Sequence, residues 1–301
     1  MAKGNDGNYL QHCVEVEAAA RLARTGPEGG LHVALTHGMA PFEELEEPKS
    51  GVRKELLYGA LAEAAGEPKC NDREIVKAYR KCRASRRRYP NTGELLRAVV
   101  GTDRLSGGIT EVDRARHGRL AKAWRDTGIR VANSSWREEL GRDGVLGCPS
   151  GLESPWLLSM DPMTFSEGGG RAENLNGSDL NLLERALGLY FGSGQPGIAC
   201  FFVYRMPGTK LNDSRLRFWD FVEDLAKNLN VRSGCFWLPH IGGNGNLAGL
   251  LFSDHRLASG FSPPDVNSGR GTPTARPGGK EILSNIPDVA GASKKFRSTP
   301  P

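Results

Sequence analysis

The sequence predicts an α/β fold built on a seven-stranded, mostly parallel sheet. Short apolar runs bounded by Gly, Pro or polar residues alternate along the chain with longer segments of helical character, which is typical of a parallel sheet covered on both faces. Residues 43–88 interrupt this alternation without a strand-like run, and residues 259–301 are rich in Gly, Pro and Ser. We therefore expect one α/β domain over 1–258, with a helical insertion at about 43–88 and a disordered tail over 259–301.

The expected elements follow in order. A helix over 9–23 precedes a buried strand over 31–35, the apolar run after Gly29-Gly30. Gly66-Glu67-Pro68 separates two helices of the insertion, at about 52–66 and 72–86. Further helices are expected at 92–100, 113–125, 135–140, 178–191 and 212–229, and further strands at 108–112, 129–132, 156–160, 198–204, 235–238 and 247–252. The Gly-rich turn at 242–246 joins the last two strands and places one antiparallel strand at the edge of the sheet.

Composition excludes several classes of protein. At 301 residues and 32.6 kDa, with 38% apolar residues and a mean hydropathy of −0.43, the chain can bury a large core. No apolar run reaches the ~18 residues of a membrane helix, so we expect no membrane partner. The six cysteines form no CxxC pair, which argues against a structural zinc site or a disulfide framework. The first residues lack the apolar stretch of a secretory signal, so a reduced cytoplasm is the predicted compartment.

Positive charge is concentrated in the insertion. The net charge is only +5, yet nine Lys and Arg residues lie between positions 73 and 97, opposed by Glu74 and Glu94. Such a cluster can follow a phosphate backbone, because each neutralised phosphate releases counterions. A solvated helix face is the alternative interpretation. The candidate nucleic-acid contacts are Arg80, Arg83, Arg86, Arg87 and Arg88.

Ligands of an open parallel sheet bind beyond the carboxyl ends of its strands. The residues there are Thr36-His37-Gly38, Glu111-Val112-Asp113, Asn133-Ser134 and Asp161-Pro162. A carboxylate at the position of Glu111 can accept both hydroxyls of a cofactor ribose. Simpler roles remain open: Glu111, Asp113, Asn133 or Ser134 as helix caps, His37 as a turn residue, and Asp161-Pro162 as a turn after the strand.

The order of these motifs resembles one family, the adenine-N6 methyltransferases of large-subunit ribosomal RNA, which have a helical insertion after the first strand. Residues 5–12, Asn-Asp-Gly-Asn-Tyr-Leu-Gln-His, resemble its N-H-A-D-V-L-K-H, and Thr36-His37-Gly38 lies where its T-H-A-G-A-G loop would be. Residues 89–92, Tyr-Pro-Asn-Thr, resemble Y-P-G-S at the return from the insertion. Residues 110–113 resemble T-E-L-H, and residues 159–162 resemble the start of I-D-P-P-Y. The resemblance covers about residues 4–255.

The resemblance implies a Rossmann-like class I methyltransferase fold with S-adenosylmethionine bound over the strand ends. It implies that His37, Gly38 and Thr92 lie near the methionine part of the cofactor, Glu111 at its ribose and Ser134 at its adenine. Asp161 and the Pro162 carbonyl would hold the target amino group. Phe165 would stack on the target base in place of the family's Tyr. The implied substrate is adenine N6 of nucleic acid, RNA more than DNA.

Three functions therefore compete. The first is this methyltransferase. The second is a catalytically inactive relative that uses the basic insertion to bind nucleic acid or a partner. The third is a hydrolase using Asp161, His37 or His240, although no nucleophile elbow or carboxylate pair is recognisable. Nothing in the sequence indicates the oligomeric state.

Overall fold

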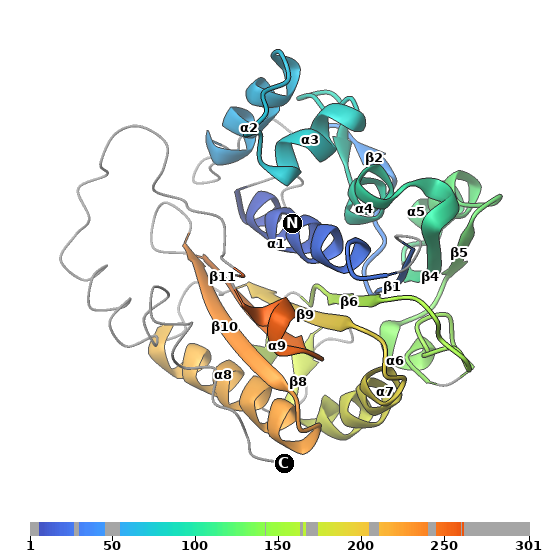
Figure 1. Ribbon diagram of the computed structural model, residues 1–301, viewed down its shortest axis with the longest axis vertical. Coiled ribbons are helices and arrows are strands. Elements are labelled where there is room, and N and C mark those ends of the chain that lie inside the picture. The colour runs from blue at the N-terminus through green and yellow to red at the C-terminus, as the bar shows by residue number, and fades with distance from the viewer. Residues whose placement is uncertain are drawn as a thin grey trace.

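The main sheet has seven strands and confirms the predicted α/β class. The computed structural model describes residues 6–26, 30–45, 55–141, 143–162, 165–166, 174–204, 211–239, 245–259 and 261. The strand order is β5-β4-β1-β6-β9-β11-β10. The strands are β1 (Leu31–Leu35), β4 (Leu105–Thr110), β5 (Gly128–Ala132), β6 (Trp156–Met160), β9 (Gly197–Tyr204), β10 (Arg232–Pro239) and β11 (Gly245–Phe252). The chain proceeds from β1 to β4 and β5 on one side and then to β6 and β9 on the other, as in Rossmann-like folds (Figure 1).

The sequence predicts that the antiparallel strand lies at the edge of the sheet, and this prediction is wrong: the antiparallel strand, β11, lies inside the sheet. β11 pairs antiparallel with both β9 and β10, and β10 is the edge strand. The burial of the two strands explains the order: Leu250, Leu251 and Phe252 of β11 are fully buried, whereas Arg232 and Ser233 of β10 are only half-buried. The expected turn at 242–246 falls mostly outside the described residues.

Helices cover both faces of the sheet. Helix α1 (Asp6–Ala23), α4 (Thr92–Val100), α5 (Arg114–Ala123) and α9 (His255–Ala258) contribute to one hydrophobic cluster. Helices α6 (Trp136–Glu139), α7 (Leu180–Gly192) and α8 (Leu211–Asn228) contribute to the other (Figure 1). Two short 3₁₀ turns (Thr102–Arg104 and Gly177–Asp179) and a small pair of strands, β7 (Phe165–Ser166) and β8 (Leu175–Asn176), complete these layers.

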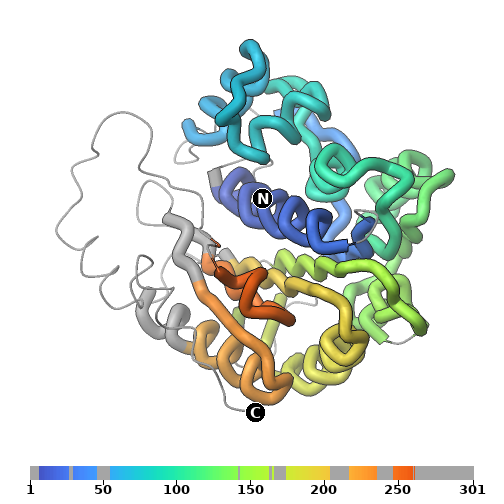
Figure 2. Tube along the Cα trace, in the orientation of Figure 1, coloured from blue at the N-terminus to red at the C-terminus, as the bar shows by residue number. Residues whose placement is uncertain are grey.

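The insertion forms a helical lobe on the α1 side of the sheet. Its ends meet in a short antiparallel ribbon of β2 (Phe42–Glu43) and β3 (Tyr89–Pro90), and it contains α2 (Glu55–Ala65) and α3 (Glu74–Lys81). Figure 2 shows both helices beyond α1, so that α1 lies between the lobe and the sheet. Leu10, Val14 and Val16 of α1 are accordingly all buried, although they face different directions around the helix.

Several boundaries differ from the sequence prediction, for example the start of α1 at Asp6 and that of β10 at Arg232, and two of the differences concern the basic insertion and the candidate site. The second helix of the insertion ends at Lys81 and not at about residue 86, because Arg83 adopts a left-handed conformation (φ 52°) that ends the helix. Strand β4 starts at Leu105, which pairs with Leu31, and ends at Thr110, so Glu111 lies in the following loop. The predicted tail lies outside the described residues except for Ser259 and Phe261, and Phe261 packs on the Phe252 ring.

Candidate functional site

The candidate site lies where the strand order reverses, at the carboxyl ends of β1, β4 and β6. The loop after β1 is tied to the loop after β4 by three hydrogen bonds. Thr110 Oγ1 donates to the Thr36 carbonyl (2.8 Å), the Gly38 amide donates to the Thr110 carbonyl (2.7 Å), and the Met39 amide donates to Glu111 Oε2 (2.8 Å). The sequence-predicted loops after these two strands are therefore brought together as one unit.

Glu111 is the buried carboxylate of this unit. Its side chain is 7% exposed, and its second oxygen, Oε1, accepts from the Asp113 amide at 2.8 Å. Both oxygens thus hold one backbone N–H each and retain a lone pair for a further donor. Capping of α5 is done by Asp113, whose side chain accepts from the Arg116 amide, and not by Glu111. The carboxylate is fixed by two loops and remains able to accept hydroxyl groups.

Gly38 and Met39 give the loop after β1 its path. A Cβ on Gly38 would lie 2.5 Å from Leu120 Cδ2 and 3.1 Å from the Thr110 carbonyl oxygen, so only glycine fits between the loop and α5. Met39 has φ 50°, which is unusual for a residue other than glycine. Asn91 supports the same turn from α4 by donating to the Gly38 carbonyl (2.7 Å) while it caps that helix. The loop is held in an uncommon conformation from two sides.

Asp161 follows β6 and lies beside a second buried acid, Glu15 of α1. Burial raises the pKa of Asp161 to about 7, against a hydrogen bond from Gln11 that lowers it. Burial also raises the pKa of Glu15 to about 7, and the neighbouring charge of Asp161 raises it further. Two acids with raised pKa values at the switch point of the sheet are typical of a functional site.

Glu15 is a site residue that the sequence analysis missed. Its oxygens accept hydrogen bonds from Ser159 Oγ (2.5 Å), Thr92 Oγ1 (2.8 Å) and Gln11 Nε2 (3.3 Å). The only signal in the sequence is an acid placed between Val14 and Val16 in an apolar helix. Thr92, predicted to lie at the cofactor, therefore belongs to the carboxyl cluster around Asp161, with its hydroxyl directed at Glu15.

His37 is a neutral side chain of the same loop. Its Nδ1 lies 2.6 Å from Thr36 Oγ1, and burial lowers the pKa of the imidazole to about 4. The imidazole is therefore uncharged at neutral pH and carries one donor and one acceptor nitrogen. No nucleophilic side chain paired with His37 or Asp161 is found among the described residues other than the neighbouring Thr36, which gives the hydrolase hypothesis no support. His240 lies outside the described part of the chain.

Ser134 makes an internal contact. Its hydroxyl donates to Glu139 Oε1 at 2.6 Å, while Ser135 caps α6 in a capping box with Glu138. The preceding Asn133 donates to the Glu111 carbonyl at 2.7 Å and so holds the loop after β4. The structure thus places Ser134 on the loop next to Glu111; its predicted contact with an adenine ring stays a prediction.

Pro162 is buried directly after Asp161, whereas Phe165 belongs to the opposite layer of the molecule. The Phe165 ring packs on Phe218 and Phe221 of α8, with ring centres 5.8 and 5.2 Å apart. It is a partly buried member of the α6–α8 hydrophobic cluster. Stacking on a base stays a prediction for Phe165, and it competes with this packing.

The predicted basic residues do not form one helix face. Ser85 and Arg88 exchange backbone hydrogen bonds of 2.9 and 3.1 Å, which makes residues 85–88 a tight turn that we call the arginine turn. The Arg86 guanidinium lies 4.2 Å from the centre of the Tyr58 ring and that of Arg88 lies 3.9 Å from the centre of the Phe42 ring. Arg83 and Arg87 are exposed. These four arginines are therefore exposed on the lobe beside the β2–β3 ribbon, two of them stacked on aromatic rings.

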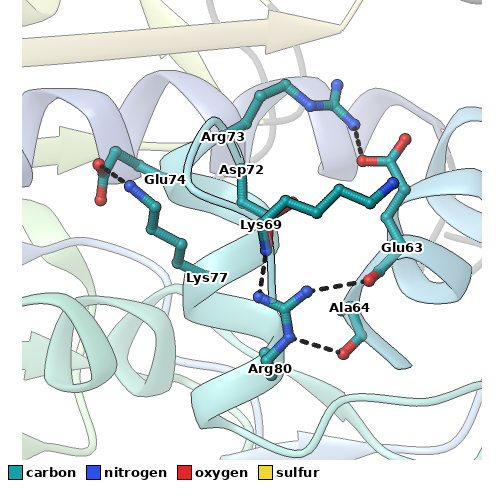
Figure 3. A network of polar contacts seen from close by, with 8 residues as sticks. All are labelled: Glu63, Ala64, Lys69, Asp72, Arg73, Glu74, Lys77 and Arg80. Atoms are coloured by element: carbon teal, nitrogen blue, oxygen red, sulfur yellow. Dashed lines mark hydrogen bonds and ion pairs between the residues drawn. The ribbon is translucent and has the colours of Figure 1, made fainter. Parts of the chain in front are cut away.

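Arg80, in contrast, is bound inside the lobe (Figure 3). Its guanidinium donates to Asp72 Oδ2 (2.8 Å) and to the carbonyls of Glu63 (3.1 Å) and Ala64 (3.2 Å), which joins α3 to the end of α2. The hydrogen bond from the Lys69 amide and that from Arg80 lower the pKa of Asp72. This network stabilises the lobe, so the predicted phosphate contact of Arg80 would require breaking it.

The described residues contain no group of acids, cysteines and histidines that could hold a metal ion. Among them, too, no helix combines the length and apolarity needed to cross a bilayer.

The strand order and the polar loops at the switch point define a Rossmann-like fold, here with an antiparallel β11. The chain is similar to a crystal structure of protein LPL1258 from Legionella pneumophila, described with the family label DUF519. The two share 15% identity with a TM-score of 0.53, over 83% of this chain and 85% of that one. This similarity supports the fold alone.

A Clostridium thermocellum protein provisionally described as an rRNA methylase matches more weakly. It shares 10% identity with a TM-score of 0.33, over 52% of this chain and 80% of that one. No protein-family model matches the chain, and no curated protein matches its sequence.

The raised pKa of Glu15 predicts a pH-dependent stability. The folded value of about 7 lies above the ordinary 4.5, so the folded state binds more protons than the unfolded state between these values, and stability falls as the pH rises through this range. In Glu15→Gln the Ser159 and Thr92 hydroxyls can turn to accept from the amide. The free energy of unfolding of this variant relative to the parent should therefore rise by about 3 kcal/mol between pH 4.5 and pH 8.

Urea unfolding at a series of pH values measures this difference. Glu17→Gln is the matched control, because Glu17 lies on the same helix but pairs with Arg21 near the surface (2.7 Å). We expect its effect to stay within about 1 kcal/mol. A pH-independent difference for Glu15→Gln would show that the buried acid does not titrate in this range.

Proposed function

We propose that this chain is an S-adenosylmethionine-dependent methyltransferase that acts on adenine N6 of nucleic acid, RNA more than DNA. The observation that carries the proposal is the placement of Glu111 and Asp161. The first follows β4 and the second follows β6, on either side of β1, at the crevice where Rossmann-like folds bind nucleotides. The resemblance of the surrounding motifs to the ribosomal RNA adenine-N6 methyltransferases supports the same chemistry.

The polar and apolar groups of the site suit S-adenosylmethionine. Glu111 retains lone pairs for the two ribose hydroxyls, and Val112 beside it is 59% exposed and offers an apolar contact for a flat ring. The buried carboxyl of Glu15 suits a neighbouring sulfonium cation. His37 and Gly38 line the loop after β1, Thr92 contacts Glu15, and Ser134 lies beyond Glu111. When bound, the cofactor supplies the electrophilic methyl group.

Asp161 and Pro162 would act on the substrate. The Asp161 carboxylate and the Pro162 carbonyl can accept the two N6–H groups of an adenine, which orients the nitrogen lone pair without a strong base. Most of the remaining acceleration comes from alignment of the two reactants. Asp161 is only partly exposed, and the reduced polarity of its surroundings would strengthen this hydrogen bond.

The arginine turn is the proposed contact for the nucleic-acid backbone. We expect the triple change Arg86→Gln, Arg87→Gln and Arg88→Gln to weaken RNA binding and to lower the log–log salt slope by about one for each phosphate that is no longer neutralised. Fluorescence anisotropy with a labelled RNA at several salt concentrations measures both. Arg80→Gln is the comparison variant, since its guanidinium is held by Asp72 and two carbonyls. Arg80→Gln should lower the melting temperature and leave the salt slope of RNA binding unchanged. If the triple variant also leaves the salt slope unchanged, the arginine turn is not part of the RNA interface.

An inactive, nucleic-acid-binding relative is the second candidate. Two observations favour it: Ser134 is bound to Glu139, and Phe165 is packed against α8. Calorimetry with S-adenosylmethionine and S-adenosylhomocysteine separates the two functions. Saturable binding of either ligand to the unmodified chain is expected for the enzyme. Absence of binding at high protein concentration, with RNA binding retained, would establish the second candidate instead.

A further inference from the structure

A second basic surface lies on α5, outside the cluster that the sequence analysis singled out. The helix carries Arg114, Arg116, Arg119 and Lys122 and no acidic residue. Arg114 and Arg116 lie in its first turn, where the helix dipole disfavours positive charge, and cations three residues apart repel one another. This charge pattern lowers the stability of the isolated helix. A local arrangement that costs stability is typical of a surface with a binding role.

Most of these cations have no partner within the described chain. Arg114, Arg119 and Lys122 are exposed and make no hydrogen bond or ion pair with another described residue. The acids near the helix are Asp113 at its start, Asp126 beyond its end, and Glu43 of β2, which lies near Arg116 only. The hydrogen bond from the Arg116 amide and the charges of Arg116 and Arg119 lower the pKa of Asp113. One cap carboxylate does not neutralise the helix, so its outer face is positively charged.

Arg116 connects α5 to the arginine turn. Its Nε lies 4.0 Å from Glu43 Oε1 on β2, and the neighbouring Phe42 ring carries the Arg88 guanidinium at 3.9 Å. The two basic segments are thus joined through two adjacent residues of the β2–β3 ribbon. Both basic segments are connected to the candidate site. The arginine turn adjoins the β2–β3 ribbon, whose strand β2 follows the loop after β1, and α5 follows Glu111. The loops themselves are bonded through the Met39 amide and Glu111.

We propose that α5 and the arginine turn form one continuous surface for the sugar-phosphate backbone of a folded RNA, with α5 as its second anchor beside the site. A helix of ten residues is about 15 Å long, a length over which one nucleic-acid strand presents about four phosphates. The three exposed cations of α5 could therefore each lie near a phosphate of one such strand segment. This inference rests on the nucleic-acid part of the proposed function and is independent of methyl transfer.

The test compares two triple variants of equal charge change without added cofactor. The first is Arg114→Gln, Arg119→Gln and Lys122→Gln on α5. The second, as matched control, is Arg24→Gln, Arg185→Gln and Lys227→Gln, three exposed cations elsewhere on the molecule. Binding of a labelled RNA hairpin is measured by anisotropy between about 50 and 200 mM salt. Melting curves confirm that both variants are folded.

We expect the α5 variant to bind the hairpin about 10- to 100-fold more weakly, with a salt slope lower by about two to three, whereas the control changes affinity less than about threefold. Combining the α5 and arginine-turn changes should reduce the slope further than either triple alone. Equal behaviour of the α5 and control variants would overturn the proposal, as would a parent chain that binds anionic phospholipid vesicles but not the hairpin. A parent that binds RNA through α5 but transfers no methyl group would leave this surface standing and refute only the enzymatic assignment.

Discussion

Glu111→Ala is expected to lower the affinity for S-adenosylmethionine by about 10- to 150-fold, which corresponds to the roughly 1.5–3 kcal/mol of charge-assisted hydrogen bonds. The variant removes the acceptor proposed for the ribose hydroxyls. It also leaves the Met39 and Asp113 amides without their partner, so the loops after β1 and β4 lose a shared anchor. Calorimetric titration measures the affinity, and a thermal melt recorded in parallel measures the decrease in stability.

Asp113→Asn is the matched control for this change. It removes a negative charge two residues away, yet asparagine also caps helices well, so α5 keeps its cap. We expect its cofactor affinity to stay within about twofold of the parent, as a remote exposed charge contributes little. If Glu111→Ala proves unstable, Glu111→Gln retains one acceptor oxygen and should bind with intermediate affinity. Full affinity in both Glu111 variants would contradict the ribose assignment.

Asp161→Asn should impair methyl transfer and not cofactor binding, in contrast to Glu111→Ala. Cofactor affinity should change by less than about threefold, while the rate of methyl transfer should fall by about 10²- to 10³-fold, the usual effect of removing one preorganised hydrogen-bond partner. The pKa of about 7 adds a pH signature, because the ionised carboxylate of Asp161 accepts the N6–H more strongly than the protonated acid does. The parent rate should rise as the pH increases through about 7, and the rate of the variant should be independent of pH in this range.

Single-turnover methyl transfer to an adenine-containing RNA measures these rates. Asp254→Asn is the control: Asp254 caps α9 by accepting from the Arg256 amide, and asparagine can do the same. It should leave both rate and pH profile unchanged. Methyl transfer by Asp161→Asn at the parent rate would exclude Asp161 from the reaction.

Local sequence patterns predicted much of the fold. Strands 31–35 and 156–160 and the helix 92–100 have the observed bounds, because each is a short buried segment closed by Gly, Pro or a capping residue. The place of β11 could not be obtained in this way. A turn between two strands fixes their pairing but not which of them approaches β9, and that depends on how much apolar surface each can bury.

The site was predicted in part, and the reasons differ from residue to residue. Glu111 and Asp161 could be placed at the switch point from the sequence, because each stands at the end of an apolar run that forms a strand; their roles stay predictions. Glu15 was missed because its partners, Ser159 and Thr92, are 144 and 77 residues away in sequence. Arg80 was counted as a free cation because charge can be read from sequence, whereas its bonds to Asp72 and the end of α2 cannot.

The position of α1 between lobe and sheet has a consequence for how the chain acquires its structure. This helix precedes all its partners in the chain, and it contacts α2, α3 and α4 on one side and β6, β9 and β11 on the other. The last of these strands ends at Phe252. The side of α1 that packs on the sheet is therefore completely covered only when nearly the whole described chain has left the ribosome, and such long-range dependence slows folding and favours aggregation of incomplete chains. The helix can dock on the lobe early, but its sheet-facing side is buried only in the finished domain.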